Sequence, residues 1–168
     1  LSKMTGLQSF MVDDNHFTGQ LVDFAGLEHI NLVNISSNLI DGTVPETFLI
    51  NAGRDDKIFV DISSNRLTGT LPNGLQRLNR LGIKADQNMI SGIDPFLCTL
   101  TAWNYYDVKE YGCDAILCAT GTYNTYGRQI SADSRCEPCA DGAKYYGAVQ
   151  CSSAKRLLTG LGLLTISC

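Results

Sequence analysis

The amino-acid sequence predicts an α/β solenoid whose stacked coils form a parallel sheet on a concave face, followed by a small disulfide-rich module. One motif, V-x-I-x-x-N-x-L-x-G-x-L-P, is read at residues 60–72 and recurs in register over the first 95 residues of the 168-residue chain. Its asparagines recur at steps of 23, 27 and 23 residues, at Asn15, Asn38, Asn65 and Asn88. Six of the seven cysteines lie between residues 113 and 168, where this motif is absent.

The spacing within the motif explains the predicted coil. Val60 and Ile62 are two residues apart, so a strand directs both side chains to the same face. Asn65 then turns the chain, and its amide can bond backbone groups that the turn leaves unpaired, including those of the next coil. Each buried group left without a partner costs roughly 1–3 kcal/mol. Leu67 and Leu71 then point back into the core, Gly69 permits a tight backbone turn, and Pro72 closes the segment where no amide donor is needed.

Further copies of the motif occupy Phe10–Leu21, Val33–Pro45 and Ile83–Pro95. This pattern resembles the plant-type leucine-rich repeat, in which Gly and Pro follow the core motif. The resemblance implies a right-handed superhelix of at least about three coils, because a single coil cannot bury its apolar face. Ala85 in place of Leu and Asp94 in place of an apolar residue depart from the pattern and affect local packing near the last coil.

Residues 1–95 are expected to hold about four repeats. The chain opens on Leu1 in mid-repeat with no polar capping element before it, so we expect a fragment of a longer protein. The third repeat carries about four extra residues around positions 49–57, which predict a solvated loop on the convex side. In the fourth repeat, Leu75, Leu78 and Leu81 are shifted by one place, which predicts a slightly shorter convex segment.

Residues 96–112 are expected to form an aromatic C-terminal cap and linker, with Trp103, Tyr105, Tyr106 and Tyr111. The last coil of a solenoid needs a cover over its apolar end, and aromatic side chains can provide it. The alternative is that these rings form a platform on which a ligand stacks. Both interpretations are open at this stage.

Residues 113–151 are expected to form a cysteine-rich module, and residues 152–168 a tail. Each half of the module reads C-x-x-G-x-[YK] and then reaches another cysteine, which resembles the ephrin-receptor-like cysteine-rich modules of extracellular proteins. The arrangement of repeats and module is similar to leucine-rich-repeat surface proteins of diatoms and related algae. The resemblance implies the pairs Cys118–Cys136 and Cys139–Cys151, with Cys98–Cys113 tying the cap to the module and Cys168 left over.

Zinc binding is the alternative to disulfide formation for these cysteines. A four-thiolate site could be built from Cys113, Cys118, Cys136 and Cys139, which include one C-x-x-C pair. The spacing of the first two cysteines is wide for such a site, and the Gly-Thr-Tyr sequence after Cys118 fits the disulfide module better. We therefore expect disulfides, an oxidising compartment and no metal.

Several function classes are disfavoured. The net charge of −4 argues against a nucleic-acid partner. His16 and His29 have no acid or nucleophile at a matching spacing, and no phosphate loop or nucleophile elbow occurs. The apolar run Leu157–Ile166 is far shorter than the roughly 20 residues that cross a bilayer. We expect no catalysis and no cofactor, and membrane attachment only through parts outside this chain.

Strand residues that point away from the core are the candidate ligand-binding positions, since loops and exposed sheet faces carry function. On that face, Leu32 and Phe59 are adjacent apolar groups, which are typical of an interaction site. Acidic residues outnumber the single Lys84, which favours a basic or hydroxyl-rich partner, although an ordinary solvated sheet face remains the alternative. The candidate residues are Met11, Asp13, Leu32, Asn34, Ser36, Phe59, Asp61, Ser63, Lys84 and Asp86, beside Ser9 and Gly82.

Asn34-Ile35-Ser36 is an acceptor motif for N-glycosylation, and Asn34 is expected to project from the concave face. The sequence favours a non-catalytic module of an extracellular or cell-surface protein that recognises a protein, peptide or glycan with this face. Two alternatives are a structural wall or matrix protein stabilised by disulfides, and an ectodomain piece of a receptor-like kinase. The four strands offer only twelve such positions, against roughly 20–30 residues a side in a standard protein interface.

Overall fold

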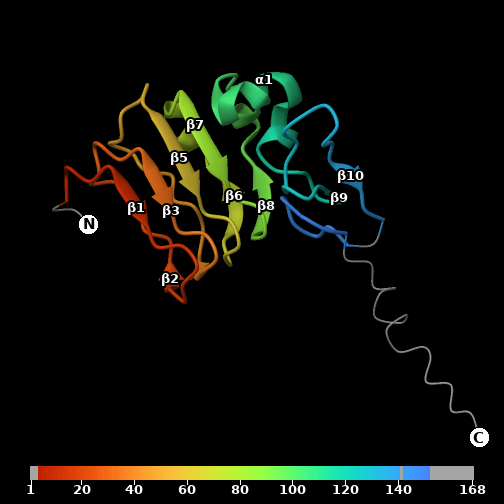
Figure 1. Ribbon diagram of the computed structural model, residues 1–168, viewed down its shortest axis with the longest axis horizontal. Helices are drawn as coiled ribbons and strands as arrows, with labels where there is room; N and C mark the ends of the chain where they lie inside the picture. The colour runs from red at the N-terminus through yellow and green to blue at the C-terminus, as the bar shows by residue number, and fades with distance from the viewer. Residues whose placement is uncertain (1–3, 141, 152–168) are drawn as a thin grey trace, which may run out of the picture.

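The computed structural model describes residues 4–140 and 142–151 and shows the predicted parallel-strand solenoid (Figure 1). Its concave sheet has four parallel strands in the order β1-β3-β5-β7. Each strand pairs with the strand of the next coil, because the same sequence motif occurs once in every coil. The strands are β1 (Ser9–Met11), β3 (Leu32–Asn34), β5 (Lys57–Asp61) and β7 (Arg80–Lys84).

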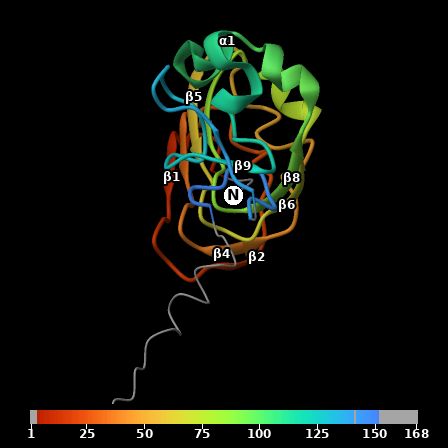
Figure 2. The same cartoon turned by 90° about the vertical axis from the view of Figure 1, so that its right-hand side faces the viewer.

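A second set of strands follows the turn of each coil. The strands are β2 (Thr18–Gln20), β4 (Leu39–Asp41), β6 (Thr68–Leu71) and β8 (Met89–Ile93), paired in parallel as β2–β4 and β6–β8. Viewed along the stack, β1 and β8 lie on opposite sides of the coils (Figure 2). The coils return through 3₁₀ turns such as η1 (Asn73–Arg77) and η2 (Pro95–Thr99), each beginning at or beside a proline that cannot continue a strand ladder.

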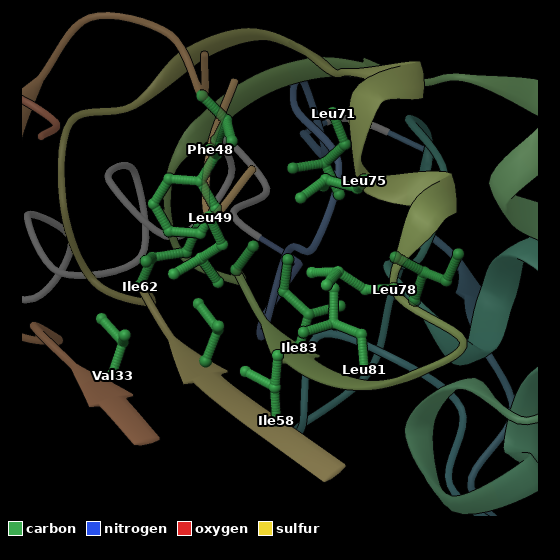
Figure 3. Close-up of a cluster of buried hydrophobic side chains, with 14 of the residues drawn as sticks. Val33, Phe48, Leu49, Ile58, Ile62, Leu71, Leu75, Leu78, Leu81 and Ile83 are labelled. Atoms are coloured by element: carbon green, nitrogen blue, oxygen red, sulfur yellow. The ribbon is translucent and has the colours of Figure 1, made fainter. Parts of the chain in front are cut away.

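The core runs through the stack between the two sets of strands. Side chains at the same motif position lie above one another, and Val33, Val60 and Ile83 are each almost completely buried. Figure 3 shows Leu75 and Leu78 of the return segment, together with Leu81 of β7, packed in this core. The one-place shift of these three leucines is therefore absorbed without exposing them.

The insertion in the third coil is only partly a solvated loop. Its charged residues are exposed, but Leu49 and Ala52 are buried in the core. The Asn51 side chain donates to the Ala25 carbonyl at 2.7 Å, which ties the loop to the preceding coil. The prediction of a purely solvated segment was too simple, because the sequence pattern did not distinguish its apolar anchors from its polar tip.

The motif asparagines form a ladder of buried amides. The Nδ2 groups of Asn38, Asn65 and Asn88 each donate at 2.9 Å to a backbone carbonyl of the preceding coil. Their Oδ1 atoms accept backbone N–H groups of that same coil at 2.9, 3.0 and 2.9 Å. The bonds therefore run to the preceding coil rather than the next one. Asn15 bonds only carbonyls of its own coil, because no described coil precedes it.

The last coil is covered by residues 96–117. The Trp103 side chain is completely buried and its indole N–H donates to the Leu78 carbonyl at 2.6 Å. The buried Asn104 amide accepts the Ile83 N–H at 2.7 Å and donates to the Ala115 carbonyl at 2.7 Å. Asn104 thus pairs a backbone donor on the outer edge of β7, where another strand would otherwise be needed. The segment contains η3 (Trp103–Tyr106), α1 (Asp107–Tyr111) and η4 (Gly112–Ala115).

The cysteine-rich module packs on the fourth coil. Its short antiparallel pair consists of β9 (Thr122–Tyr123) and β10 (Glu137–Pro138). The Gln87 N–H donates to the Gly147 carbonyl at 3.2 Å, and the Tyr146 N–H donates to the Ile90 carbonyl at 2.9 Å. These bonds join the module to the solenoid directly, beyond the covalent connection.

Three disulfides are present among the described residues, and they link the pairs that the family resemblance implies: Cys98–Cys113, Cys118–Cys136 and Cys139–Cys151. All four cysteines of the zinc alternative are therefore in disulfides. Cys168 and the run Leu157–Ile166 lie outside the described residues. No helix within the described ranges has the length and apolar content needed to cross a bilayer.

Candidate interaction site on the concave face

The concave face consists of the strand positions that alternate with the buried ones. Strand pairing aligns these positions in columns, for example Met11 beside Asn34, Asn34 beside Asp61, and Asp61 beside Lys84. A second column, two residues earlier along each strand, contains Ser9, Leu32, Phe59 and Gly82. Counting back from each asparagine thus places these side chains on one face in the expected order.

The candidate positions on this face differ in exposure. At β1 the Met11 side chain is 61% exposed, and at β3 Leu32 and Asn34 are half-buried. Toward the C-terminal end, Asp61, Ser63 and Asp86 are only 7–8% exposed. The lower exposure there has a physical cause, because residues 96–140 and 142–151 fold over the last two coils. The accessible part of the face therefore lies over β1, β3 and the first residues of β5 and β7.

Asp61 is held within the face by its neighbours. Its Oδ2 forms an ion pair with the Lys84 ammonium at 3.1 Å. Its Oδ1 accepts the backbone N–H and the hydroxyl of Ser63. The expectation that this carboxylate projects into solvent was wrong, since its lone pairs are used by the protein itself. Asp61, Ser63 and Lys84 instead fix the shape of the surface.

Asp86 lies under the cysteine-rich module. Gly127 and Gly147 pass so close to it that a methyl group at either position would collide with Asp86. Burial raises the pKa of Asp86, an effect opposed by the Gln87 amide and the Lys84 charge. The nearby Arg128 has its pKa lowered by burial, with the Asp107 and Asp86 charges opposing that shift. Of the three aspartates expected on this face, Asp61 and Asp86 are therefore buried against other parts of the protein, and Asp13 is the more accessible one.

Asn34 and Ser36 form a local turn on the accessible part of the face. The Asn34 Oδ1 accepts the Ser36 N–H at 3.2 Å and the Ser36 hydroxyl at 2.8 Å. Both residues are half-buried, and the Asn34 Nδ2 makes no bond to a described residue. The amide nitrogen that a glycan would use is therefore not engaged by the protein.

A fourth column extends the face in a direction that sequence counting missed. Lys57 and Arg80 are the first residues of β5 and β7, they are paired in register, and both are exposed. They share a face with Phe59 and Gly82, two residues further along each strand. A sequence signal existed, since both cations stand eight residues before a motif asparagine. The count stopped at six residues.

These cations border a hollow of about 240 Å³ that is also lined by Gly82, Ala102, Tyr105 and Tyr106. The Lys57 ammonium lies 4.6 Å from the centre of the Tyr105 ring. Tyr105 and Tyr106 are 56% and 60% exposed, whereas Trp103 is buried. The two interpretations of the aromatic segment thus apply to different residues: Trp103 covers the core, and the two tyrosines are exposed on the rim of the hollow.

The backbone that presents these tyrosines is strained. Asn104, Tyr105 and Tyr106 have φ values of 47°, 61° and 77°, in the left-handed region. This conformation costs roughly 1–2 kcal/mol for each residue with a Cβ atom. The two Asn104 amide bonds and the buried Trp103 hold the turn in place. Strain of this kind is often found at functional sites.

One model of a known protein family matches part of this chain. The family model described as Leucine Rich Repeat matches residues 58–78, which run from β5 into η1. A solved structure described as a TDR receptor aligns with 61% of this chain and 22% of its own, at 22% identity and a TM-score of 0.39. The aligned part is thus a small fraction of that receptor. No curated protein matches the chain.

Proposed function

We propose that this leucine-rich-repeat chain is a non-catalytic recognition module of an extracellular or cell-surface protein, and that it binds a protein, peptide or glycan ligand on its concave face. The observation that carries the proposal is the accessible apolar surface at Met11, Leu32 and Phe59. Leu32 and Phe59 stand on strands that are paired on both sides, and Met11 stands on the edge strand β1, which pairs with β3. The asparagine ladder fixes the turns that follow these strands. A rigid scaffold loses little conformational entropy of its own when a partner binds to its exposed apolar groups.

The buried polar residues of the face have a supporting role in this proposal. Asp61, Ser63 and Asp86 are closed off by neighbouring groups, so direct ligand contact is assigned to the accessible positions. Those positions are Met11, Asp13, Leu32, Asn34, Ser36, Phe59 and part of Lys84. Disulfides persist in oxidising compartments, and the three disulfides support an extracellular location.

The test is capture of partners from an extracellular fraction by the immobilised chain. Leu32→Glu places a charge in the apolar surface and should abolish capture of the specific partners. Phe96→Glu is the matched control, because Phe96 is 50% exposed but lies in η2 on the return side of the coils. Equal capture by wild type and Leu32→Glu would remove the concave face as the binding site.

A further inference from the structure

The hollow beside Tyr105 combines positive charge with exposed aromatic rings. The ion pair between Lys84 and Asp61 is the salt bridge that the structure shows, and over residues 4–140 and 142–151 neither Lys57 nor Arg80 contacts a carboxylate. These two cations are adjacent across the sheet, in paired positions of β5 and β7. An anion placed between the two cations would be attracted by both charges.

The rings next to these cations are placed for contact with a ligand. Gly82 lies beneath them, and a Cβ atom there would be 3.1 Å from the Phe59 ring and 3.6 Å from the Tyr105 ring. The glycine therefore lets both rings approach the sheet. Covering the core does not require exposed tyrosines, because the buried Trp103 and Asn104 already close the end of the stack.

We propose that this hollow binds an acidic sugar unit of an extracellular polysaccharide. The carboxylate or sulfate group would lie between Lys57 and Arg80, and the C–H face of the sugar ring would pack on Tyr106 and the edge of Tyr105. This inference rests on the proposed recognition function and specifies one ligand class for it. It also changes the expected partner, since the accessible charge at this end of the face is basic rather than acidic.

The size and shape of the hollow favour a sugar over an acidic peptide or a nucleic acid. Its volume of about 240 Å³ lies below the roughly 300–1,000 Å³ of pockets that enclose a whole small-molecule ligand. It therefore holds one unit of a longer chain that continues outside. The carboxylates of an acidic peptide would pair with Lys57 and Arg80 but would not pack on the tyrosine rings. A nucleic acid requires a basic surface wider than two cations on a chain of net charge −4.

The test is affinity electrophoresis of the whole chain in gels that contain a defined polymer. Polygalacturonate supplies carboxylated sugars, dextran sulfate supplies sulfated sugars, and plain dextran is the neutral control. We expect retardation by one or both acidic polysaccharides and none by plain dextran. Retardation by polygalacturonate alone identifies the carboxylate, and retardation by dextran sulfate alone identifies the sulfate. Equal retardation by dextran, or none by either acidic polymer, overturns the proposal.

Variants locate the binding. The pair Lys57→Ala/Arg80→Ala should weaken polysaccharide binding about tenfold, because two charge contacts are lost. The control pair Arg66→Ala/Arg135→Ala removes two exposed cations elsewhere and should leave binding within about twofold. Intact-mass measurement and Trp103 fluorescence check that each variant is oxidised and folded. Equal weakening by both pairs would show attraction to net charge alone and would overturn the proposal.

A third variant separates a sugar from any polyanion. Tyr106→Ala should weaken binding of the acidic polysaccharide while the chain binds polyglutamate weakly or not at all. Unchanged polysaccharide binding by Tyr106→Ala, together with strong polyglutamate binding, would refute the sugar. Loss of this site and loss of the recognition function are distinguishable, since Leu32→Glu tests partner capture at a residue that does not line the hollow.

Discussion

Replacing Asn65 with alanine is the sharpest test of how the coils are held together. The Asn65 Oδ1 accepts the Ile40 N–H at 3.0 Å, and its Nδ2 donates to the Ile35 and Ser63 carbonyls at 2.9 and 3.1 Å. The Ile40 N–H is buried, so its loss of a partner is not repaired by water. The Ile35 carbonyl keeps a second donor, the Asn38 amide, at 3.2 Å.

The size of the effect follows from these contacts. One fully stranded donor and one or two weakened acceptors, at roughly 1–3 kcal/mol per stranded group, predict a loss of about 2–5 kcal/mol in the free energy of unfolding. Domains of this kind are stable by roughly 5–15 kcal/mol, so the loss is a large fraction of the whole. Asn15→Ala is the matched control, because Asn15 is exposed and bonds only carbonyls of its own coil. We expect it to cost less than about 1 kcal/mol.

Urea unfolding under non-reducing conditions measures both values. The protein has a single tryptophan, Trp103, which is buried against the last coil and reports loss of the stack by its fluorescence. A value for Asn65→Ala within about 0.5 kcal/mol of wild type would refute the reasoning. So would an equal loss for Asn15→Ala, since the two asparagines occupy the same motif position and differ in what lies on the preceding side.

Three further predictions concern charge, glycosylation and the cap. Burial raises the pKa of Asp86, so the folded carboxyl holds its proton more tightly than the unfolded one, and stability falls as the pH rises from 3.8 through the folded value. In Asp86→Asn that fall is absent, so unfolding curves from pH 3.5 to pH 7 should show the variant gaining stability relative to wild type; parallel curves would contradict this. Secretion from a glycosylating host should add a glycan at Asn34, and intact-mass measurement should show its loss in Ser36→Ala; an unmodified wild-type mass would disprove occupancy. Replacing both Cys98 and Cys113 by serine opens a loop of sequence separation 15 and should cost about 3 kcal/mol by urea unfolding, whereas an unchanged midpoint would show that the cap is held by packing alone.

The repeat spacing predicts the solenoid well because each rule acts over a few residues. Side chains alternate along a strand, so Val60 and Ile62 must share the core face once the strand forms. The asparagine at a fixed distance then places the turn. These local rules also tolerate imperfection, since Leu75, Leu78 and Leu81 remain buried despite their shift along the sequence.

The surface was harder to predict because it depends on contacts between distant segments. Asp86 is covered by Gly127 and Gly147, which lie far along the chain in the cysteine-rich module. The repeat pattern contains no information about where that module folds. The acidic residues that the sequence placed on the concave face are therefore less accessible than expected at Asp61, which is paired with Lys84, and at Asp86, which is buried.

The basic hollow was missed for two different reasons. Lys57 and Arg80 stand at equal distances before Asn65 and Asn88, so a longer count from each asparagine would have placed them in one column. The exposure of Tyr105 and Tyr106 follows instead from a left-handed turn, which no propensity of Tyr predicts. Asn104 holds that turn through a bond to β7, a contact that only the folded structure shows.

Native-state hydrogen exchange measured by NMR tests the buried amide ladder most directly. The backbone N–H groups of Ile40 and Leu67 are bonded to asparagine side chains rather than to a neighbouring strand. They should nevertheless exchange as slowly as the sheet amides, with opening free energies near that of global unfolding. The amides of the exposed residues Arg54 and Asp55 should exchange orders of magnitude faster. Exchange of Ile40 and Leu67 at the rate of those loop amides would contradict the ladder.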